Sequence, residues 1–186
     1  MNPEPVTPSI VAKAKKIKLM LFDVDGVMTD GAVVLHGDGT ESKRFHIRDG
    51  IAMVWAQRAG LRVGLLSARQ SPSTAQRAAQ LGITLVHQGV ASKIDTYDQI
   101  VGDMVLTDDE VAYMGDDIVD LAVLGRVGLA AVPSDATAEA RARADFVSAY
   151  AGGAGAVREV VELVLRAQGL WDAIVAAYEA EGQPGQ

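Results

Sequence analysis

The chain has 186 residues, of which 49% are apolar and 22% charged, with a formal net charge of −7 and no cysteine. This length and composition predict one globular domain, while the lack of cysteine excludes a disulfide framework and a thiolate metal site. The negative charge argues against a nucleic-acid surface, and no apolar run approaches the ~18 residues of a membrane helix, so we expect a cytoplasmic protein.

Residues 1–16 are expected to form a frayed leader. The first ten residues are rich in proline and polar groups and lack the apolar run of a secretory signal. A basic cluster is expected to solvate the approach to the core, and it comprises Lys13, Lys15, Lys16 and Lys18. Residues 19–22 then form a continuous apolar run, which predicts a buried parallel strand.

A hairpin is predicted next, within residues 31–45. Residues 33–35 and 42–45 flank a turn that contains glycine, a pattern typical of two antiparallel strands. A helix is predicted over 49–58, ended by Gly60.

Further strand-and-helix units follow, in which each strand is a short apolar run and several helices begin near a capping residue or a proline. The strands are expected at 62–66, 84–87, 111–114, 128–132 and 146–148, and the helices at 71–81, 92–101, 117–124, 137–144 and 155–168. A helix at 171–181 and a loose tail from residue 182 are expected to end the chain.

This alternation predicts an α/β fold, a doubly wound parallel sheet with helices on both faces. A single domain is expected over residues 17–169, followed by the C-terminal helix and tail over 170–186. Ligands of such sheets bind beyond the carboxyl ends of the strands, so the residues that end each strand are the candidates for chemistry.

The strand ends carry a coherent set of side chains. Asp23 and Asp25 follow the first strand, Ser67 the second, Lys93 the third after a short loop, and Asp116 the fourth. Clustered carboxylates repel one another unless a cation sits among them, and oxygen ligands favour Mg²⁺. A hydroxyl and an ammonium beside them suit a phosphoryl group, which predicts phosphoryl transfer.

The Asp-x-Asp spacing has a chemical meaning of its own. Residues two apart at a strand end point the same way, so both carboxylates can face one substrate. One can attack phosphorus, and the other can protonate the leaving alcohol and then deprotonate water. Taken alone, each of these residues would be a loop residue, a surface charge or a helix cap, as Asp117 is expected to be. The histidines are expected to be structural or exposed, namely His36, His46 and His87.

The stretch 23–31, Asp-Val-Asp-Gly-Val-Met-Thr-Asp-Gly, resembles the first motif of haloacid-dehalogenase-like phosphatases. Ser67, Lys93 and residues 115–120 resemble the other three motifs. The resemblance implies that Asp23 is the nucleophile and Asp25 the acid/base. It also implies that Mg²⁺ is held by the Asp23 and Asp116 carboxylates and the Asp25 carbonyl, that Ser67 and Lys93 hold the phosphoryl group, and that Asp120 orients Lys93.

A narrower resemblance involves residues 45–50, 152–159 and 167–169. These segments are similar to the 3-deoxy-D-manno-octulosonate 8-phosphate phosphatase subfamily, over about residues 17–169. That resemblance implies a sugar acid phosphate of lipopolysaccharide biosynthesis as substrate, a hairpin flap without a large cap domain, and a homotetramer whose hairpins pack together. It also implies a sugar-phosphate pocket lined by His46, Ile47, Arg48, Asp49, Gly50, Arg69 and Arg77.

Three positions depart from the family pattern. Ala68 stands where the family usually has Gly, and Val54 and Ala154 stand where relatives commonly carry basic residues. A missing charge partner can shift specificity, so a nine-carbon sialic-acid-type 9-phosphate is the competing substrate. Two different classes of protein are weaker candidates, namely a receiver-like phosphoacceptor domain and a non-catalytic sugar-phosphate-binding subunit.

Overall fold

The computed structural model describes residues 6–181, and its centre is a six-stranded, wholly parallel sheet in the order β5-β4-β1-β6-β7-β8. The strands are β1 Leu19–Phe22, β4 Arg62–Leu66, β5 Leu85–His87, β6 Val111–Met114, β7 Leu129–Val132 and β8 Phe146–Val147. The predicted α/β class is confirmed. The chain builds outward from β1 to β5, then returns to the other side of β1 with β6, so the order reverses at β1.

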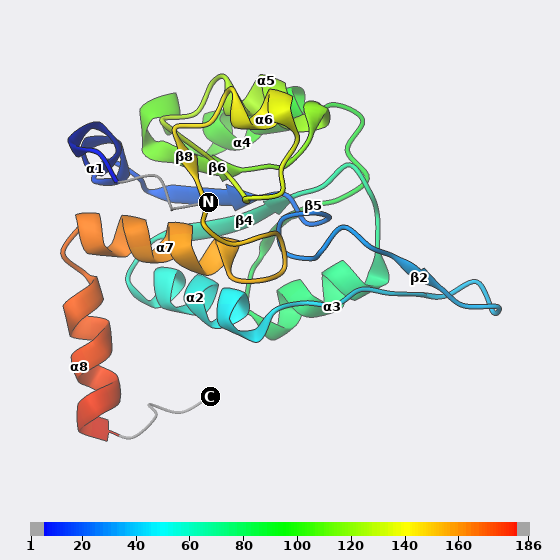
Figure 1. The fold of residues 1–186 in the computed structure, drawn as a ribbon, viewed down its shortest axis with the longest axis horizontal. Helices are drawn as coiled ribbons and strands as arrows, with labels where there is room; N and C mark the ends of the chain where they lie inside the picture. Colours follow the sequence, from blue (N-terminus) through cyan, green and yellow to red (C-terminus); the bar gives the residue numbers. More distant parts are fainter. Residues whose placement is uncertain (1–5, 182–186) are drawn as a thin grey trace.

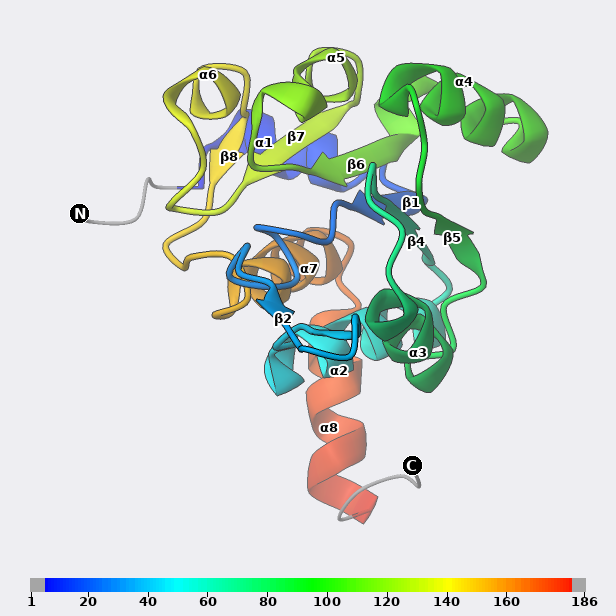
Figure 2. The same cartoon turned by 90° about the vertical axis from the view of Figure 1, so that its right-hand side faces the viewer.

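Helices cover both faces of the sheet. They are α1 Pro8–Ala14, α2 Ile47–Arg58, α3 Pro72–Gln80, α4 Lys93–Met104, α5 Leu121–Leu124, α6 Ala138–Arg141, α7 Ala156–Ala167 and α8 Trp171–Glu181, with 3-10 turns η1 Asp108–Glu110 and η2 Ile118–Asp120. Helices α4, α5 and α6 lie on one side, and α2, α3 and α7 on the other (Figures 1 and 2). Helix α8 extends away from the body, and the residues described contain no large second domain.

Strand β1 is buried on both faces, which explains its unbroken apolar run. Leu19 and Leu21 belong to the core beneath α4 and α5, whereas Met20 and Phe22 belong to the core beneath α2 and α7. Successive side chains of a strand point to opposite faces, so one four-residue strand contributes to two cores. The end of β1 is thereby fixed from both sides.

Helix α1 lies inside the segment expected to be a frayed leader, and that expectation does not hold for residues 8–14. The Thr7 hydroxyl accepts a hydrogen bond from the Ile10 amide at 3.3 Å, and Pro8 fits the first turn. Ile10 and Ala14 are buried on the α7 side of the sheet. Three lysines of the basic cluster form ion pairs: Lys13 with Asp145, Lys16 with Asp109 and Lys18 with Glu110.

The predicted hairpin is present with shorter strands, β2 Val34–Leu35 and β3 Glu41–Ser42. It projects from the body of the molecule (Figure 1), and Val34 and Leu35 are 57% and 77% exposed. Helix α2 begins two residues earlier than predicted, and α4 runs three residues further. The tail expected from residue 182 lies outside the described residues.

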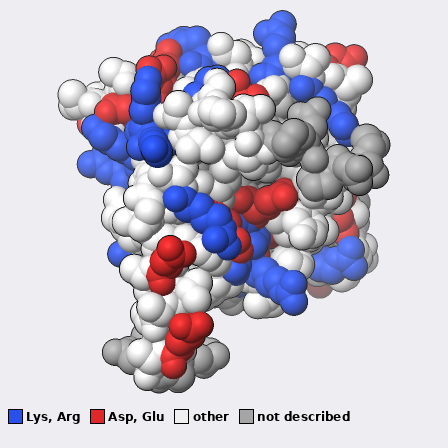
Figure 3. Space-filling model, turned by 60° about the vertical axis from the view of Figure 1, so that its left-hand side comes forward, with Lys and Arg blue, Asp and Glu red and all other residues white. Residues whose placement is uncertain are grey.

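Figure 3 shows acidic and basic side chains interspersed on the face it presents, without a broad basic area. Within residues 6–181, no helix combines the length and apolar character needed to cross a membrane.

The C-cap of α4 is strained. Val105 adopts a left-handed conformation, with φ of 54°, although its side chain is 89% exposed and gains little from packing. A left-handed L-residue costs roughly 1–2 kcal/mol, while glycine adopts that conformation freely at some cost in chain entropy.

We therefore expect Val105→Gly to raise the free energy of unfolding by about 1 kcal/mol, because relief of strain outweighs the added entropy of the unfolded chain. Urea denaturation of the two proteins measures the change. Val105→Ala is the matched control, since it removes the exposed methyl groups and keeps a Cβ in the strained position. An equal gain in both variants would contradict this account.

Candidate active site

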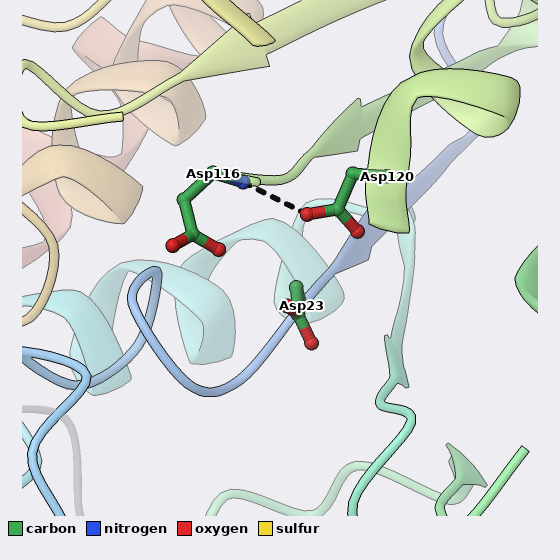
Figure 4. Close-up of side chains that lie close together, drawn as sticks. All are labelled: Asp23, Asp116 and Asp120. Carbon is green, nitrogen blue, oxygen red and sulfur yellow. Dashed lines mark hydrogen bonds between the residues drawn. The ribbon is translucent and has the colours of Figure 1, made fainter. Parts of the chain in front are cut away.

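Three acidic side chains converge at the carboxyl ends of β1 and β6. Oxygen atoms of Asp23, Asp116 and Asp120 all lie within 4.8 Å of one another (Figure 4). Asp23 follows β1 directly, and Asp116 and Asp120 come from the segment after β6. Phe22 and Met114 are paired at the ends of these neighbouring parallel strands, so the residues that follow them are brought together.

Glycines allow this close approach. A Cβ on Gly26 would lie 2.1 Å from an Asp116 carboxylate oxygen, and Gly26 also has a φ of +86° that disfavours other residues. A Cβ on Gly115 would lie 2.4 Å from the Asp120 carboxyl carbon. A Cβ on Gly152 would lie 1.8 Å from the Gly26 carbonyl oxygen, so the loop before α7 rests directly on the loop after β1.

The Asp120 carboxylate is fully buried and accepts four hydrogen bonds. One oxygen accepts from Lys93 Nζ at 2.6 Å and from the Tyr113 hydroxyl at 2.5 Å. The other accepts from the backbone amides of Asp116 and Asp117 at 3.0 and 3.1 Å. With both oxygens engaged, this carboxylate is suited to orienting Lys93 rather than to binding a metal. Asp117 caps η2, as predicted, by accepting from the next amide at 2.7 Å.

Lys93 is the first residue of α4 and lies buried between two carboxylates. Its ammonium is 3.0 Å from Asp23 Oδ2 and 2.6 Å from Asp120. Ser92 is the N-cap of α4, and its hydroxyl accepts from the Asp95 amide at 3.2 Å. Burial by itself would lower the pKa of Lys93, but Asp23 and Asp120 outweigh it and raise that pKa above its usual value.

Two carboxyl groups at this site, those of Asp23 and Asp116, have raised pKa values. Burial, opposed by Lys93, raises the pKa of Asp23 to about 6. Burial, reinforced by Asp23 and Asp120, raises the pKa of Asp116 to about 7. The Asp116 carboxylate oxygens make no hydrogen bond or ion pair with any of residues 6–181. An unpaired carboxylate beside a second one is the donor set that a hard divalent cation would relieve, so these residues fit Mg²⁺.

Asp25 lies on the hairpin side of the site. Its carboxylate is paired with the Lys43 ammonium, which is 2.7 Å from Oδ1 and 2.9 Å from Oδ2. Lys43 was not predicted as a site residue, although a signal for it exists. Successive side chains of an extended strand point to opposite faces, so Lys43 would share a face with Glu41 and Phe45. With Ser42 facing the solvent, Lys43 would then point toward the protein.

Ser67 follows β4 directly and is buried at this edge of the sheet. Its amide donates to the His87 carbonyl at 2.9 Å, and its hydroxyl accepts from the Arg69 amide at 3.3 Å. The Arg69 guanidinium pairs with Glu41 of the hairpin at 2.9 Å. Ser67 therefore occupies the predicted strand end, while Arg69 links the hairpin to the loop after β4.

The predicted sugar-pocket residues divide into two groups. His46 and Arg48 line a hollow of about 470 Å³ at the amino end of α2, together with Ala154. They and Ile47, which is 73% exposed, also line an adjacent hollow. Gly50 is instead buried against α3, where an added Cβ would be 2.2 Å from the Arg77 guanidinium. His46, Ile47 and Arg48 therefore lie at an accessible surface, and Gly50 does not.

Two further predicted pocket residues make contacts within the protein. Asp49 is 2% exposed, and its two carboxylate oxygens accept from the amides of Gly155 and Arg158 at 3.2 and 2.8 Å. Both of its oxygens thus contact amides at the start of α7. Arg77 lies 6.0 Å from the centre of the Phe45 ring, and burial lowers its pKa.

Comparisons with known proteins decide the family. No protein-family model matches the chain. The curated 3-deoxy-D-manno-octulosonate 8-phosphate phosphatase KdsC of Escherichia coli K12 is 38% identical over 179 residues, covering 96% of this chain and 92% of that protein. The KdsC of Yersinia pestis is 36% identical and covers 88% of each chain. The chain belongs to the 3-deoxy-D-manno-octulosonate 8-phosphate phosphatase family.

Solved structures agree with this assignment. The 3-deoxy-D-manno-octulosonate 8-phosphate phosphatase of Moraxella catarrhalis, crystallised with a magnesium ion, a phosphate ion and a KDO molecule, superposes with a TM-score of 0.89 at 34% identity. The match covers 91% of this chain and 97% of that one. A hydrolase of Legionella pneumophila assigned to the HAD superfamily superposes equally well at 36% identity, covering 93% and 95%.

Family membership makes the chain a phosphoric monoester hydrolase with a haloacid-dehalogenase-like fold. This leaves the receiver-like phosphoacceptor and the non-catalytic subunit without support. The predicted family resemblance is confirmed.

The raised pKa of Asp116 predicts a pH dependence for the metal-free protein. Between about pH 4 and pH 7 the folded chain holds a proton on Asp116 that the unfolded chain has released. The contribution of Asp116 to the free energy of unfolding therefore falls as the pH rises through that interval, and it is constant at higher pH. We expect Asp116→Asn, which carries no charge, to gain stability relative to the wild type between pH 5 and pH 8.

Urea denaturation without divalent metal measures this difference at the two pH values. Adding Mg²⁺ at pH 8 should raise the wild-type midpoint more than the Asp116→Asn midpoint, because a metal bound by the folded state stabilises it. A difference between the two proteins that does not change with pH would contradict the proposed cause.

Proposed function

We propose that the chain hydrolyses 3-deoxy-D-manno-octulosonate 8-phosphate to the free sugar acid and phosphate through a phosphorylated Asp23. The observation that supports it most is the position of Asp23. Asp23 directly follows the central strand, and its carboxylate is 3.0 Å from the Lys93 ammonium and lies beside the unpaired carboxylate of Asp116. A nucleophile held by one cation and facing a candidate cation site is suited to attack a phosphoryl group.

In this mechanism the two aspartates after β1 have different roles, Asp23 as the nucleophile and Asp25 as the acid and base. Asp23 attacks phosphorus as the bond from phosphorus to the sugar oxygen breaks, and Asp25 gives its proton to that oxygen. Asp25 then takes a proton from the water that attacks phosphorus, and Asp23 is released as a carboxylate. Ser67 and Lys93 hold the phosphoryl oxygens, and Asp120 keeps Lys93 in place.

Mg²⁺ is the proposed cofactor, held by the carboxylates of Asp23 and Asp116 and the carbonyl of Asp25. When bound, it neutralises negative charge on the phosphoryl oxygens. The raised pKa values of the two carboxyl groups support this assignment, as does the magnesium ion in the Moraxella catarrhalis relative.

The sugar is supported by the relatives and by the hollow at the amino end of α2. Val54 packs against the core, whereas Ala154 lines the hollow beside Arg48. Arg48 therefore offers a cation to a sugar acid carboxylate even though Ala154 carries no charge. A nine-carbon sialic-acid-type 9-phosphate is the competing substrate that an assay must separate.

Phosphate release from a panel of sugar phosphates tests the proposal. With Mg²⁺ present we expect the octulosonate 8-phosphate to have the highest kcat/KM, above nine-carbon sialic-acid-type 9-phosphates and hexose phosphates. Asp23→Asn should lower turnover by at least about 10³-fold, because an amide cannot form the phosphorylated intermediate. A higher kcat/KM for the nine-carbon substrate would replace the proposed sugar, and substantial turnover by folded Asp23→Asn would remove the proposed nucleophile.

We also propose a homotetramer in which the hairpins meet. Val34 and Leu35 expose apolar surface on a two-stranded sheet that a single domain does not cover. An isolated hairpin is marginal in water, and its edges favour pairing with another chain. The hairpin also carries Lys43 to Asp25, so assembly and the site share one element.

Val34→Asp should therefore shift the protein toward smaller species and lower kcat/KM several-fold, because a buried apolar contact becomes a charged one. Light scattering with phosphate release at the same concentration measures both effects. Val105→Asp, at the end of α4, is the matched control and should change neither. A wild-type monomer with full activity at micromolar concentration would defeat the proposal.

A further inference from the structure

Lys43 is buried although it belongs to an exposed hairpin. Its side chain is 0% exposed, whereas that of its neighbour Arg44 is 84% exposed. A buried ammonium is costly unless it is paired. Lys43 is paired with both oxygens of Asp25, at 2.7 and 2.9 Å, and its ammonium lies 3.5 Å from the hydroxyl of Thr74.

The backbone of the hairpin next to Lys43 is held by contacts with the rest of the protein. Glu41 forms an ion pair with Arg69 at 2.9 Å, and its carbonyl accepts from the Ser73 hydroxyl at 3.3 Å. Thr74, beside Lys43, is 1% exposed on α3. These contacts join the hairpin to the loop after β4 and to α3. The ammonium therefore reaches Asp25 from a supported backbone rather than from a free loop.

The two buried lysines serve different aspartates. Lys93 contacts Asp23 and Asp120, and Lys43 contacts Asp25. Within residues 6–181, Asp25 has no other ion-pair partner. The Asp25 carboxylate is 20% exposed, so its orientation depends on this one cation more than on packing around it.

We propose that Lys43 is a positioning residue that fixes the Asp25 carboxylate for its two proton transfers, an inference that rests on the function proposed above. Asp25 loses its proton to the sugar oxygen as the bond from phosphorus to that oxygen breaks and the bond from phosphorus to Asp23 forms. It regains a proton from water as the oxygen of that water bonds to phosphorus and the bond to Asp23 breaks. Lys43 keeps all its protons and balances the carboxylate that exists between the two transfers.

The first test compares Lys43→Met with Arg44→Met. Both replace a hairpin cation by a neutral side chain of similar length, but only the first removes the partner of Asp25. With the octulosonate 8-phosphate we expect Lys43→Met to lower kcat/KM about 10- to 100-fold, since a positioned acid contributes about 10²–10⁴-fold. This ratio reports the steps up to phosphorylation of Asp23, in which the leaving group departs, and not the later attack of water that both substrates share. With p-nitrophenyl phosphate, whose leaving group needs little protonation, the loss should be below about 3-fold. Arg44→Met should stay within about 3-fold on both substrates, by the usual size of surface effects. An equal loss by Lys43→Met on both substrates would mean a merely structural role and overturn the inference.

The second test is a double-mutant cycle with Asp25→Asn, assayed with p-nitrophenyl phosphate and the sugar phosphate. If Lys43 acts through Asp25, adding Lys43→Met to Asp25→Asn should change kcat less than about 2-fold, because the two residues form one unit. The double variant lacks both charges of the buried pair, so it leaves no lone charge to prevent folding.

If the losses of kcat caused by the two single substitutions multiply in the double variant, the two residues act independently and the assignment is contradicted. A wild type inactive on every sugar phosphate would overturn the proposed function, whereas an active wild type matched by Lys43→Met would overturn the Lys43 inference alone.

Discussion

A buried ammonium shared by two carboxylates holds the ends of the central strands together. Lys93 begins α4, Asp23 follows β1 and Asp120 lies after β6, so one cation joins three separate parts of the chain. Removing it would leave two buried carboxylates without a counter-charge, which is strongly destabilising. The contact also orients the carboxylate that binds the amides of Asp116 and Asp117, and hence the position of the candidate metal ligand.

Backbone contact is the second constraint on the site. Gly26 touches the Asp116 carboxylate, and Gly152 touches Gly26 in turn. The segment before α7 and the loop after β1 therefore leave no room for a side chain between them. Asp49 strengthens the same arrangement from α2 by accepting hydrogen bonds at the start of α7. The loop after β1, the segment before α7 and the start of α7 form one packed unit. A change in any of them would therefore shift the carboxylates of the site.

Much of this architecture is readable from the sequence because its signals are local. Each buried strand is an apolar run, and each run ends near a residue that the fold brings to one edge of the sheet. Ser92 and Asp117 are caps recognisable from the sequence, and both cap their elements. The start of α2 lacks such a signal, because His46 makes no side-chain capping bond, and the prediction began two residues late.

The remaining differences involve partners distant in sequence. The hydrogen bond from Gly155 to Asp49 spans 106 positions, so no local pattern distinguishes that acid from a pocket residue. The alternation of residues 41–45 could have directed Lys43 inward, but it does not identify the partner, Asp25, which lies 18 positions away. At the N-terminus, prolines suggested irregular structure, although Thr7 followed by Pro8 is also a helix start.

The charges gathered at the strand ends have a consequence for binding of the substrate. In the proposed mechanism Asp25 carries a proton when the substrate arrives, so three carboxylates, those of Asp23, Asp116 and Asp120, would face the ammonium groups of Lys43 and Lys93, which leaves one negative charge in excess. A phosphomonoester arrives as a dianion and is repelled by that excess, while a divalent cation cancels it. On the proposed function, a cation held by these carboxylates would therefore ease binding of the sugar phosphate, and loss of the cation would restore the repulsion.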